Sequence, residues 1–183
     1  MAEPLAVDLA SDRLDLPLAA PGDWREILPI TSDEKNYDFE LSDPDDRKAL
    51  VAGLGRSHFP AGFRESGLLT FLVRRRSDGV AIGLIHLQVE AGHFSGYLGF
   101  MIHHPFQRQG YGAEALGEVL EFAFGTLNLR RVWSSCDARN VACIRLLGKS
   151  GFGQEGVMAD AGYHAKRGWI DIPIFSRINR VGG

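Results

Sequence analysis

Residues 68–102 alternate apolar runs with short polar turns, a pattern typical of β-strands that follow one another along the chain. The run "LLTFLVRRR" (68–76) is followed by "SDGV", whose Asp-Gly pair is a hairpin signal. The chain returns as "AIGLIHLQV" (81–89), turns again at "EAGHFSG", and ends in "YLGFMI" (97–102). Three such runs separated by tight turns predict an antiparallel meander.

Helical periodicity replaces this pattern between about Gly110 and Thr126. Apolar residues recur there at three- and four-residue steps, which predicts a helix with one buried face. That face consists of Leu116, Val119, Leu120, Ala123 and Leu127. Because "RRVWSSC" (130–136) reads as the next strand, we expect the helix to connect it in parallel to the strand at 97–102.

The two ends of the chain complete a mixed sheet with helices on both faces. Toward the C-terminus, "NVACIRLLGKS" (140–150) predicts a helix that ends at Gly151, and "FGQEGVM" and "GWIDIPIFSRI" predict two strands. Toward the N-terminus, "RLDLPLAA" (13–20) predicts a strand, "PGDWREIL" a short helix, and residues 43–56 a longer helix.

The composition is that of an ordinary soluble globular domain, and it excludes several classes of function. The 183 residues are 45% hydrophobic and carry a net charge of −3, which leaves no basic footprint for nucleic acid. No apolar stretch is long enough to cross a membrane, and the start "MAEPLAVDLASD" lacks the features of a secretory signal. The two cysteines, Cys136 and Cys143, match neither a disulfide framework nor a zinc site, so we expect a cytoplasmic protein without a metal.

The domain organisation follows from the same patterns. Residues 1–12 are small, acidic and aperiodic, so we expect a loosely ordered tail there and a single domain over residues 13–178. The arginine run at 74–76 is expected at a solvated strand end.

The connection "QRQGYG" (107–112), between a strand and a helix, has the features of an anion site. A helix that starts after a parallel strand directs unpaired backbone N–H groups and the positive end of its dipole at one spot. Gly110 and Gly112 let the backbone approach a ligand, and Arg108 adds a mobile cation. The spacing matches neither a P-loop nor a dinucleotide-binding motif, so the ligand stays unnamed, and a glycine turn without a ligand stays open.

This loop and the segments after it resemble the GNAT N-acetyltransferase superfamily. "QRQGYG" followed by "AEAL" is similar to the coenzyme A pyrophosphate loop of that superfamily, Gln/Arg-x-x-Gly-x-Gly/Ala. "NVACIRLLGKSGF" (140–152) resembles its Asn-x-x-Ser/Ala…Gly-Phe segment, and "GWIDIPIFS" resembles the last strand of the branch with ribosomal-protein N-terminal alanine/serine acetyltransferases. The resemblance spans about residues 12–178. It implies an α/β (α+β) GNAT fold, with a mixed, mostly antiparallel seven-stranded sheet whose central parallel strands splay apart.

The resemblance also implies acetyl-coenzyme A (acetyl-CoA) as the acetyl donor. It places the backbone of Gln107–Gly112 on the pyrophosphate and the main chain of Met101–His103 along the pantetheine, between the splayed strands. It places Asn140 beside the pantetheine near the thioester, and the position of Asn140 independently predicts a helix N-cap. The residues in these contacts are Met101, Ile102, His103, Gln107, Arg108, Gln109, Gly110, Tyr111, Gly112 and Asn140.

Three positions depart from the catalytic pattern of the superfamily. Leu147 stands where many members have a tyrosine that protonates the leaving thiolate. Cys143 stands where the ribosomal-type branch commonly has a serine, and its thiol is a candidate proton donor, with a small buried hydrophobe as the alternative. Tyr97, ahead of Gly99 and Phe100, is a candidate at the position where that branch often has a glutamate base.

Other side chains are candidates for handling the proton or binding the amine. His103 and His104 face opposite ways on an extended backbone, so at most one of them accepts the proton of the amine through water. His86 lies within an apolar strand and is expected to be an ordinary sheet histidine. Glu155 and Asp171 lie on the last two strands, where the acceptor enters, with ordinary strand-face acids as the alternative.

We therefore expect an N-acetyltransferase that transfers the acetyl group directly to an amine, with a backbone N–H at the end of strand 97–102 stabilising the oxyanion. The favoured acceptor is the α-amine of a protein or peptide, because its pKa of about 8 leaves it partly neutral at pH 7, unlike lysine at about 10.4. A small amine (an antibiotic, a polyamine or an amino acid) and a non-catalytic acyl-CoA-binding module are the alternatives. The protein is expected to be a monomer or a homodimer.

Overall fold

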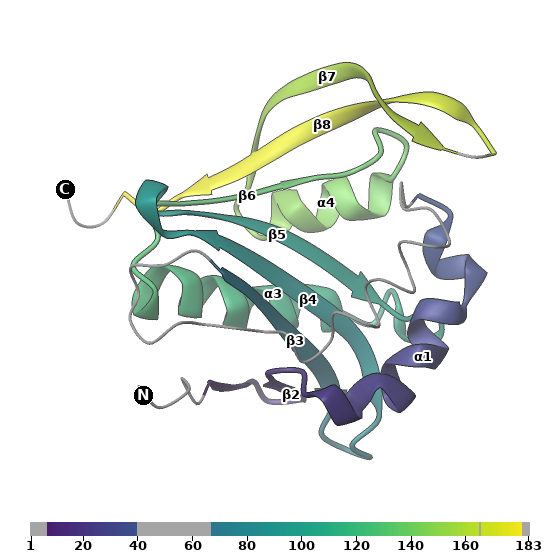
Figure 1. The fold of residues 1–183 in the computed structure, drawn as a ribbon, viewed down its shortest axis with the longest axis vertical. Coiled ribbons are helices and arrows are strands. Elements are labelled where there is room, and N and C mark those ends of the chain that lie inside the picture. The colour runs from purple at the N-terminus through teal and green to yellow at the C-terminus, as the bar shows by residue number, and fades with distance from the viewer. Residues whose placement is uncertain (1–6, 40–66, 165, 181–183) are drawn as a thin grey trace.

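An open eight-stranded sheet forms the centre of the molecule (Figure 1), in the order β1-β2-β3-β4-β5-β6-β8-β7. The computed structural model describes residues 7–39, 67–164 and 166–180, so the helix predicted over residues 43–56 lies outside the described residues. The strands are β1 (Asp8–Ala10), β2 (Leu14–Pro17), β3 (Gly67–Arg75), β4 (Ala81–Glu90), β5 (Ser95–Ile102), β6 (Arg131–Ser135), β7 (Gly153–His164) and β8 (Gly168–Ile178). The described α-helices are α1 (Trp24–Ser32), α3 (Tyr111–Glu121) and α4 (Val141–Lys149). Within this described part, no helix is long and apolar enough to cross a membrane.

The strand pairing confirms the predicted meander and the predicted parallel pair. β3, β4 and β5 pair antiparallel in sequence, and β5 pairs parallel with β6. α3 lies in the connection between these two parallel strands, as the helical periodicity predicts. β8 then lies antiparallel between β6 and β7. The mixed, mostly antiparallel sheet is confirmed, but it has eight strands where seven were expected.

The additional strand, β1, lies inside the segment for which a loose tail is expected. Residues 8–10 pair antiparallel with β2, and Leu9 lies opposite Leu16. Val7 is buried in the core, and Leu9 packs against it. The expectation for residues 1–12 is therefore corrected at β1, where backbone hydrogen bonding to a neighbouring strand orders a stretch without apolar periodicity.

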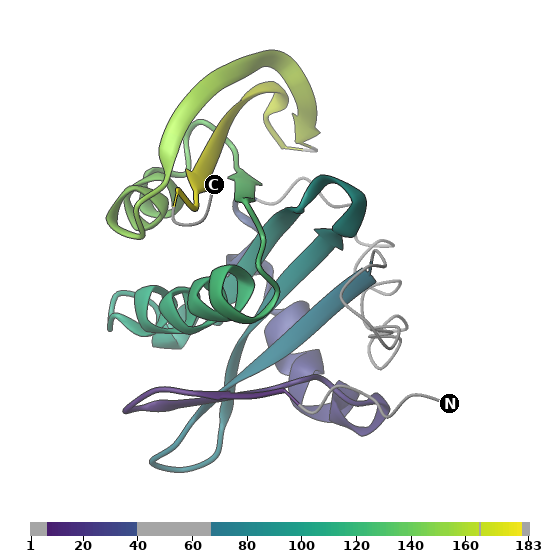
Figure 2. The same ribbon diagram turned by 90° about the vertical axis from the view of Figure 1, so that its left-hand side faces the viewer.

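Alternation along β5 divides its side chains between two cores. Leu98 and Ile102 belong to the larger core, with the buried residues of α3, whereas Met101 packs against the smaller core with Ile27 and Ile30 of α1. Figure 2 shows α3 and α4 on one side of the sheet and α1 on the other. The side of the sheet that α1 covers is called the α1 face below.

α3 buries the face that the periodicity predicts. All of the predicted apolar positions are buried, from Leu116 at 0% exposed to Leu127 at 5%. After Glu121 the helix widens into a π-helical turn, Phe122–Thr126, in which the Leu127 N–H donates to the Phe122 carbonyl at 3.0 Å. The Phe122 ring meets Phe71 of β3 edge-on, with centroids 6.0 Å apart. The wider turn therefore lies directly over the sheet.

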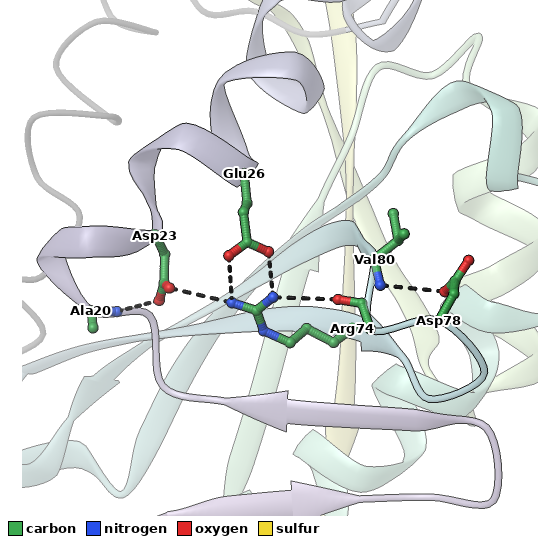
Figure 3. Close-up of polar contacts among 7 residues, drawn as sticks. Ala20, Asp23, Glu26, Arg74, Asp78 and Val80 are labelled. Atoms are coloured by element: carbon green, nitrogen blue, oxygen red, sulfur yellow. Dashed lines mark hydrogen bonds and ion pairs between the residues drawn. The ribbon is translucent and has the colours of Figure 1, made fainter.

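A cluster of ion pairs anchors α1 to the end of β3 (Figure 3). Arg74 donates to both carboxylate oxygens of Glu26, at 3.0 Å from Nη2 to Oε1, and its Nη2 lies 3.3 Å from Asp23 Oδ1. Asp23 Oδ2 accepts from the Ala20 N–H at 2.7 Å. The hydrogen bonds from Arg74 lower the pKa of Glu26 below its usual range. The positive charge of Arg74, at the end of β3, thus pairs with the negative charges of Asp23 and Glu26 in a partly buried contact.

The rest of the arginine run is paired as well. Arg75 donates to Asp78 in the following turn at 3.0 Å, and Arg76 Nε lies 3.1 Å from Asp15 of β2. The expected position at a strand end is correct. In addition, each arginine of the run binds a different carboxylate.

β4 and β5 approach each other closely at Gly83. A Cβ atom at this position would lie 2.4 Å from the Met101 carbonyl oxygen and 2.8 Å from Ile102 Cδ1. Gly83→Ala therefore forces two paired strands apart, and we expect the free energy of unfolding to fall by about 2–3 kcal/mol in urea titrations. The control is Gly117→Ala on the exposed side of α3, where nothing lies within 4 Å and alanine should stabilise the helix by up to about 1 kcal/mol. Equal stability of Gly83→Ala and the native protein would contradict the close approach.

Candidate active site

The two parallel strands separate after a short pairing (Figure 1). β5 pairs with β6 through Ser95, Gly96 and Tyr97, whereas it pairs with β4 as far as Ile102. From residue 98 onward, no described strand pairs with this edge of β5. The separation confirms the splayed central pair that the family resemblance implies.

The register of β4 and β5 determines which backbone groups of β5 face the gap. The His103 N–H donates to the Ile82 carbonyl at 2.8 Å, so residues 99, 101 and 103 direct their N–H and C=O groups to β4. Phe100 and Ile102 direct theirs to the side that β6 has left. The Ile102 carbonyl accepts from Gln107 Nε2 at 2.8 Å. The N–H groups of Phe100 and Ile102 are therefore the donors of β5 that point into the gap.

The loop from β5 to α3 has the backbone shape expected of an anion site. Arg108 and Gly110 both have positive φ angles, +61° and +86°. Gly110 is the N-cap of α3 and has no side chain to cap the first amide groups. Gly112 serves a different purpose, because a Cβ there would lie 3.1 Å from Leu146 Cδ2 of α4. One glycine turns the backbone and the other lets α3 approach α4.

Arginines from the N-terminal part of the sheet contact this loop, and the sequence analysis missed them. Arg13 Nη1 donates to the Gln109 carbonyl at 3.2 Å, and the guanidinium lies over the Tyr111 ring, 4.6 Å from its centroid. Arg75 lies over the Phe106 ring at 4.8 Å. Arg13 and Gln109 are 96 positions apart, so no local pattern connects them.

Asn140 caps α4, as its position predicts. Its Oδ1 accepts from the Cys143 N–H at 3.0 Å, which leaves the amide NH2 group as a donor. The preceding turn is held by Asp137, which is 1% exposed and accepts two side-chain hydrogen bonds from Arg139, at 2.9 and 3.0 Å. Burial acts to raise the pKa of Asp137, but the hydrogen bonds from Arg139 outweigh it and leave the pKa lowered. Asn140 is thus held in a charged turn between β6 and α4.

The two cysteines lie together beside this turn. The thiol of Cys143, in the first turn of α4, forms a hydrogen bond with Cys136 and lowers the pKa of Cys136. Both side chains are half-buried and pack against the larger core. Cys136 was not a candidate from the sequence, although strand alternation after Val132 already places it on the same side of the sheet as α4. Leu147 is fully buried, so the position of the missing tyrosine lies within the core.

Tyr97 lies on the α1 face at the point where the strands separate. Its ring meets Trp133 of β6 edge-on, with centroids 4.7 Å apart. A Cβ at Gly99 would lie 3.7 Å from Tyr97 Cε1, so the absence of a side chain there leaves room beside the ring. Tyr97 therefore forms part of the wall of the gap.

His86 of β4 lies opposite Gly99 on the same face. Its Nδ1 is 2.9 Å from Thr70 Oγ1, and burial lowers its pKa to about 4. The imidazole is therefore neutral and hydrogen-bonded at neutral pH, which agrees with the interpretation as an ordinary sheet histidine.

The two histidines after β5 are tied to the segment that follows α1. His103 Nε2 lies 3.2 Å from Asp33 Oδ2, and the His104 N–H donates to Asn36 Oδ1 at 2.7 Å. The Lys35 N–H, together with His103, lowers the pKa of Asp33. His103 thus has a carboxylate partner that orients its ring.

The two candidate acids of the last strands already have partners. Glu155 accepts from Arg131 through both oxygens and from Ser176 Oγ at 2.6 Å, and these hydrogen bonds lower its pKa to about 2. Asp171 Oδ1 accepts from the Asp160 N–H at 3.0 Å. Glu155 is therefore ionised and paired, and too weakly basic to accept a proton from an amine. Across the described ranges, no three side chains of His, Cys, Asp or Glu form a group that could hold a metal ion.

Known proteins match this chain over most of its length. The family model of the acetyltransferase (GNAT) domain matches residues 13–153. The uncharacterized N-acetyltransferase YnaD of Bacillus subtilis (strain 168) is 26% identical over 140 residues, which cover 73% of this chain and 75% of that protein.

Two solved structures share the fold. RimL, a ribosomal α-N-protein acetyltransferase solved in complex with coenzyme A, has a TM-score of 0.79 at 18% identity, covering 94% of this chain and 98% of its own. Spermidine N-acetyltransferase from Vibrio cholerae, in complex with coenzyme A and spermine, has a TM-score of 0.77 at 20% identity, covering 92% and 96%. These likenesses confirm the GNAT fold.

The neutral histidine of β4, His86, predicts a specific dependence of stability on pH. The folded state keeps His86 neutral down to about pH 4, whereas an unfolded chain protonates histidine near pH 6.5. The contribution is therefore fully present above pH 6.5 and is lost as the pH falls toward 4, by about 2 kcal/mol between pH 7 and pH 5. Urea unfolding at both pH values should show a smaller difference for His86→Gln than for the native protein. The control is His93→Gln at an exposed turn, and an unchanged difference in His86→Gln would contradict the assignment.

Proposed function

The chain belongs to the GNAT acetyltransferase family, and we propose that its acceptor is the α-amine of a protein or peptide N-terminus. The family match makes the chain an acetyl-CoA-dependent N-acetyltransferase. Acetyl-CoA supplies a thioester that an amine can attack directly, so no acyl-enzyme is needed. The acceptor and the roles of individual residues are our inference from the geometry of the gap and the loop.

The loop Gln107–Gly112 is the proposed site of the pyrophosphate. The positive φ angles at Arg108 and Gly110 leave the first amide groups of α3 uncapped, where the helix dipole favours an anion. Arg108 is exposed, so its guanidinium can reach a phosphate oxygen. The shape and charge of the loop therefore fit a pyrophosphate.

The proposed site of the pantetheine is the gap between β5 and β6, along the main chain of Met101–His103. The Asn140 amide, at the start of α4, donates to it from the other side. Within the gap, the N–H groups of Phe100 and Ile102 are fixed by the β4 pairing. One of them stabilises the negative charge that develops on the thioester oxygen, because a preset donor needs no reorganisation during the reaction.

Two side chains are proposed to transfer protons around this centre, and a third is proposed to position the amine. His103 accepts the proton of the attacking amine through a water molecule, with Asp33 holding its ring in place. Cys143 donates a proton to the leaving thiolate and is not itself acetylated. Tyr97 lines the gap on the α1 face and holds the amine against the thioester.

The ion pairs on the α1 face are the basis of our proposal for the acceptor. The carboxylates of Glu26, Asp33 and Glu155 lie beside the basic side chains of Arg74, His103 and Arg131. A polyamine carries several positive charges at pH 7 and needs several unpaired carboxylates in return. An α-amine is already partly neutral and needs no such cluster. Among the described residues, this pairing is the observation that favours an α-amine.

The fold of the solved relatives does not distinguish an α-amine acceptor from a polyamine. The RimL structure and the spermidine acetyltransferase have TM-scores of 0.79 and 0.77 with this chain. A polyamine is therefore the second acceptor to include in any test.

Acetyl transfer to a peptide tests the proposed acceptor. We expect CoA release with a short peptide that has a free α-amine, and mass spectrometry should locate the acetyl group on that amine. The control is the same peptide with a blocked N-terminus and a free lysine, which should accept at least about tenfold more slowly because its amine is largely protonated at pH 7. Transfer to spermidine but to no free peptide N-terminus would overturn the proposal.

Gly110→Asp tests the pyrophosphate site. A carboxylate at the N-cap of α3 repels an anion, so we expect acetyl-CoA to bind at least about tenfold more weakly in a calorimetric titration, while the protein stays folded. The control is Gly168→Asp in the β7–β8 turn, where φ is also positive (+75°) and nothing lies within 4 Å. Unchanged affinity in Gly110→Asp would refute the assignment of the loop.

A further inference from the structure

Arg13, immediately before β2, contacts the loop and the first turn of α3 at several points. Its Nη1 donates to the Gln109 carbonyl at 3.2 Å, its guanidinium lies 4.6 Å from the centroid of the Tyr111 ring, and its Nε donates to Glu114 Oε2 at 2.7 Å. Its Nη2 lies 3.3 Å from the point where a Cβ at Gly110 would be. One side chain from the N-terminal part of the sheet thus contacts the second half of the proposed pyrophosphate loop.

The contact with Gln109 determines the direction of the next amide. A trans peptide is planar, so its C=O and N–H groups point in opposite directions. Because Arg13 binds the Gln109 carbonyl, the Gly110 N–H points away from the Arg13 guanidinium. Glycine lets a peptide flip at little cost, so a loop with Gly110 at this point needs an outside contact to keep one orientation.

The contact with Glu114 balances a negative charge close to the same loop. Glu114 accepts from Ser11 Oγ at 2.6 Å and from the Arg13 backbone N–H at 3.0 Å, in addition to the guanidinium. Burial acts to raise its pKa, but these hydrogen bonds outweigh it and leave the pKa lowered. Glu114 is therefore charged, and Arg13 offsets its repulsion of an anion at the start of α3.

We propose that Arg13 is a positioning residue for the acetyl donor, and that it acts by holding the Gln109–Gly110 peptide with its N–H toward the pyrophosphate. The proposal rests on the pyrophosphate assignment above. Arg13 contacts the loop and not the gap between β5 and β6, so its effect is on donor binding and not on acetyl transfer itself.

The test compares two thioester donors in steady-state kinetics. S-acetylpantetheine has the same thioester as acetyl-CoA but lacks the pyrophosphate and the nucleotide. In Arg13→Met we expect the KM for acetyl-CoA to rise about tenfold, as for the loss of a charged hydrogen bond, with kcat within about twofold of the native value. The KM for S-acetylpantetheine should stay unchanged. A merely structural role would affect both donors and would lower kcat.

The matched control is Arg76→Met. Arg76 is 50% exposed against 48% for Arg13, and it binds Asp15 and the Ser11 carbonyl on the same part of the sheet. Neither of these partners belongs to the loop, so the KM for acetyl-CoA should stay at the native value. Arg13→Lys, which keeps the charge but loses the planar fork, provides a milder variant and should raise the same KM.

Glu114→Gln distinguishes two possible effects of Arg13, which are orienting the Gln109–Gly110 peptide and balancing the charge of Glu114. If Arg13 acted only by offsetting Glu114, Glu114→Gln would restore the KM of Arg13→Met. We expect no recovery in the double variant, and a full recovery would overturn the proposed mechanism.

The outcomes also separate this proposal from the assignment on which it rests. If Gly110→Asp keeps its affinity for acetyl-CoA, the pyrophosphate assignment itself fails. If Gly110→Asp loses affinity while Arg13→Met keeps the native KM, the assignment stands and only the role of Arg13 is wrong. An equal rise in KM for both donors in Arg13→Met also overturns that role.

Discussion

The parallel pairing of β5 with β6 stops at Tyr97 and leaves the following part of β5 with one open edge. Backbone N–H and C=O groups inside a protein need partners, and a strand that loses its neighbour leaves a row of them without one. Here Gln107 satisfies the Ile102 carbonyl, and the N–H groups of Phe100 and Ile102 face the gap. The candidate site therefore lies at the open edge of β5, and its most rigidly held donors are backbone N–H groups.

An unpaired edge keeps its position only if the other edge is held firmly. β4 does this by pairing with β5 as far as Ile102, with a close approach at Gly83 that admits no side chain. α1 then supports the same region from the α1 face through Met101, and the Arg74 cluster ties α1 to β3. The close approach at Gly83 thus lies beside the gap, where a shift of the backbone would move the donors.

The parts that could be predicted from the sequence are those with a local cause. The apolar alternation of β3 to β5, the buried face of α3 and the cap at Asn140 depend on neighbours in the chain. β1 escaped prediction because its order comes from pairing with β2, and Arg13 because its partners lie about 100 positions away. The neighbouring thiols of Cys136 and Cys143 depend on how α4 packs against the end of β6, which periodicity does not specify.

The charges beside the loop before α3 differ from those on the α1 face, and each arrangement suits one of the two proposed substrates, the acetyl donor or the amine. On the loop side, the uncapped amides and the dipole of α3 suit an anion, which fits the proposed pyrophosphate site. On the α1 face, Glu26 and Glu155 already bind arginines. A free carboxylate beside the acceptor would raise the pKa of its ammonium group and hold the proton that must leave before attack. Pairing Glu26 and Glu155 with arginines reduces this opposition, which fits the proposed acceptor, an amine that is already close to neutral.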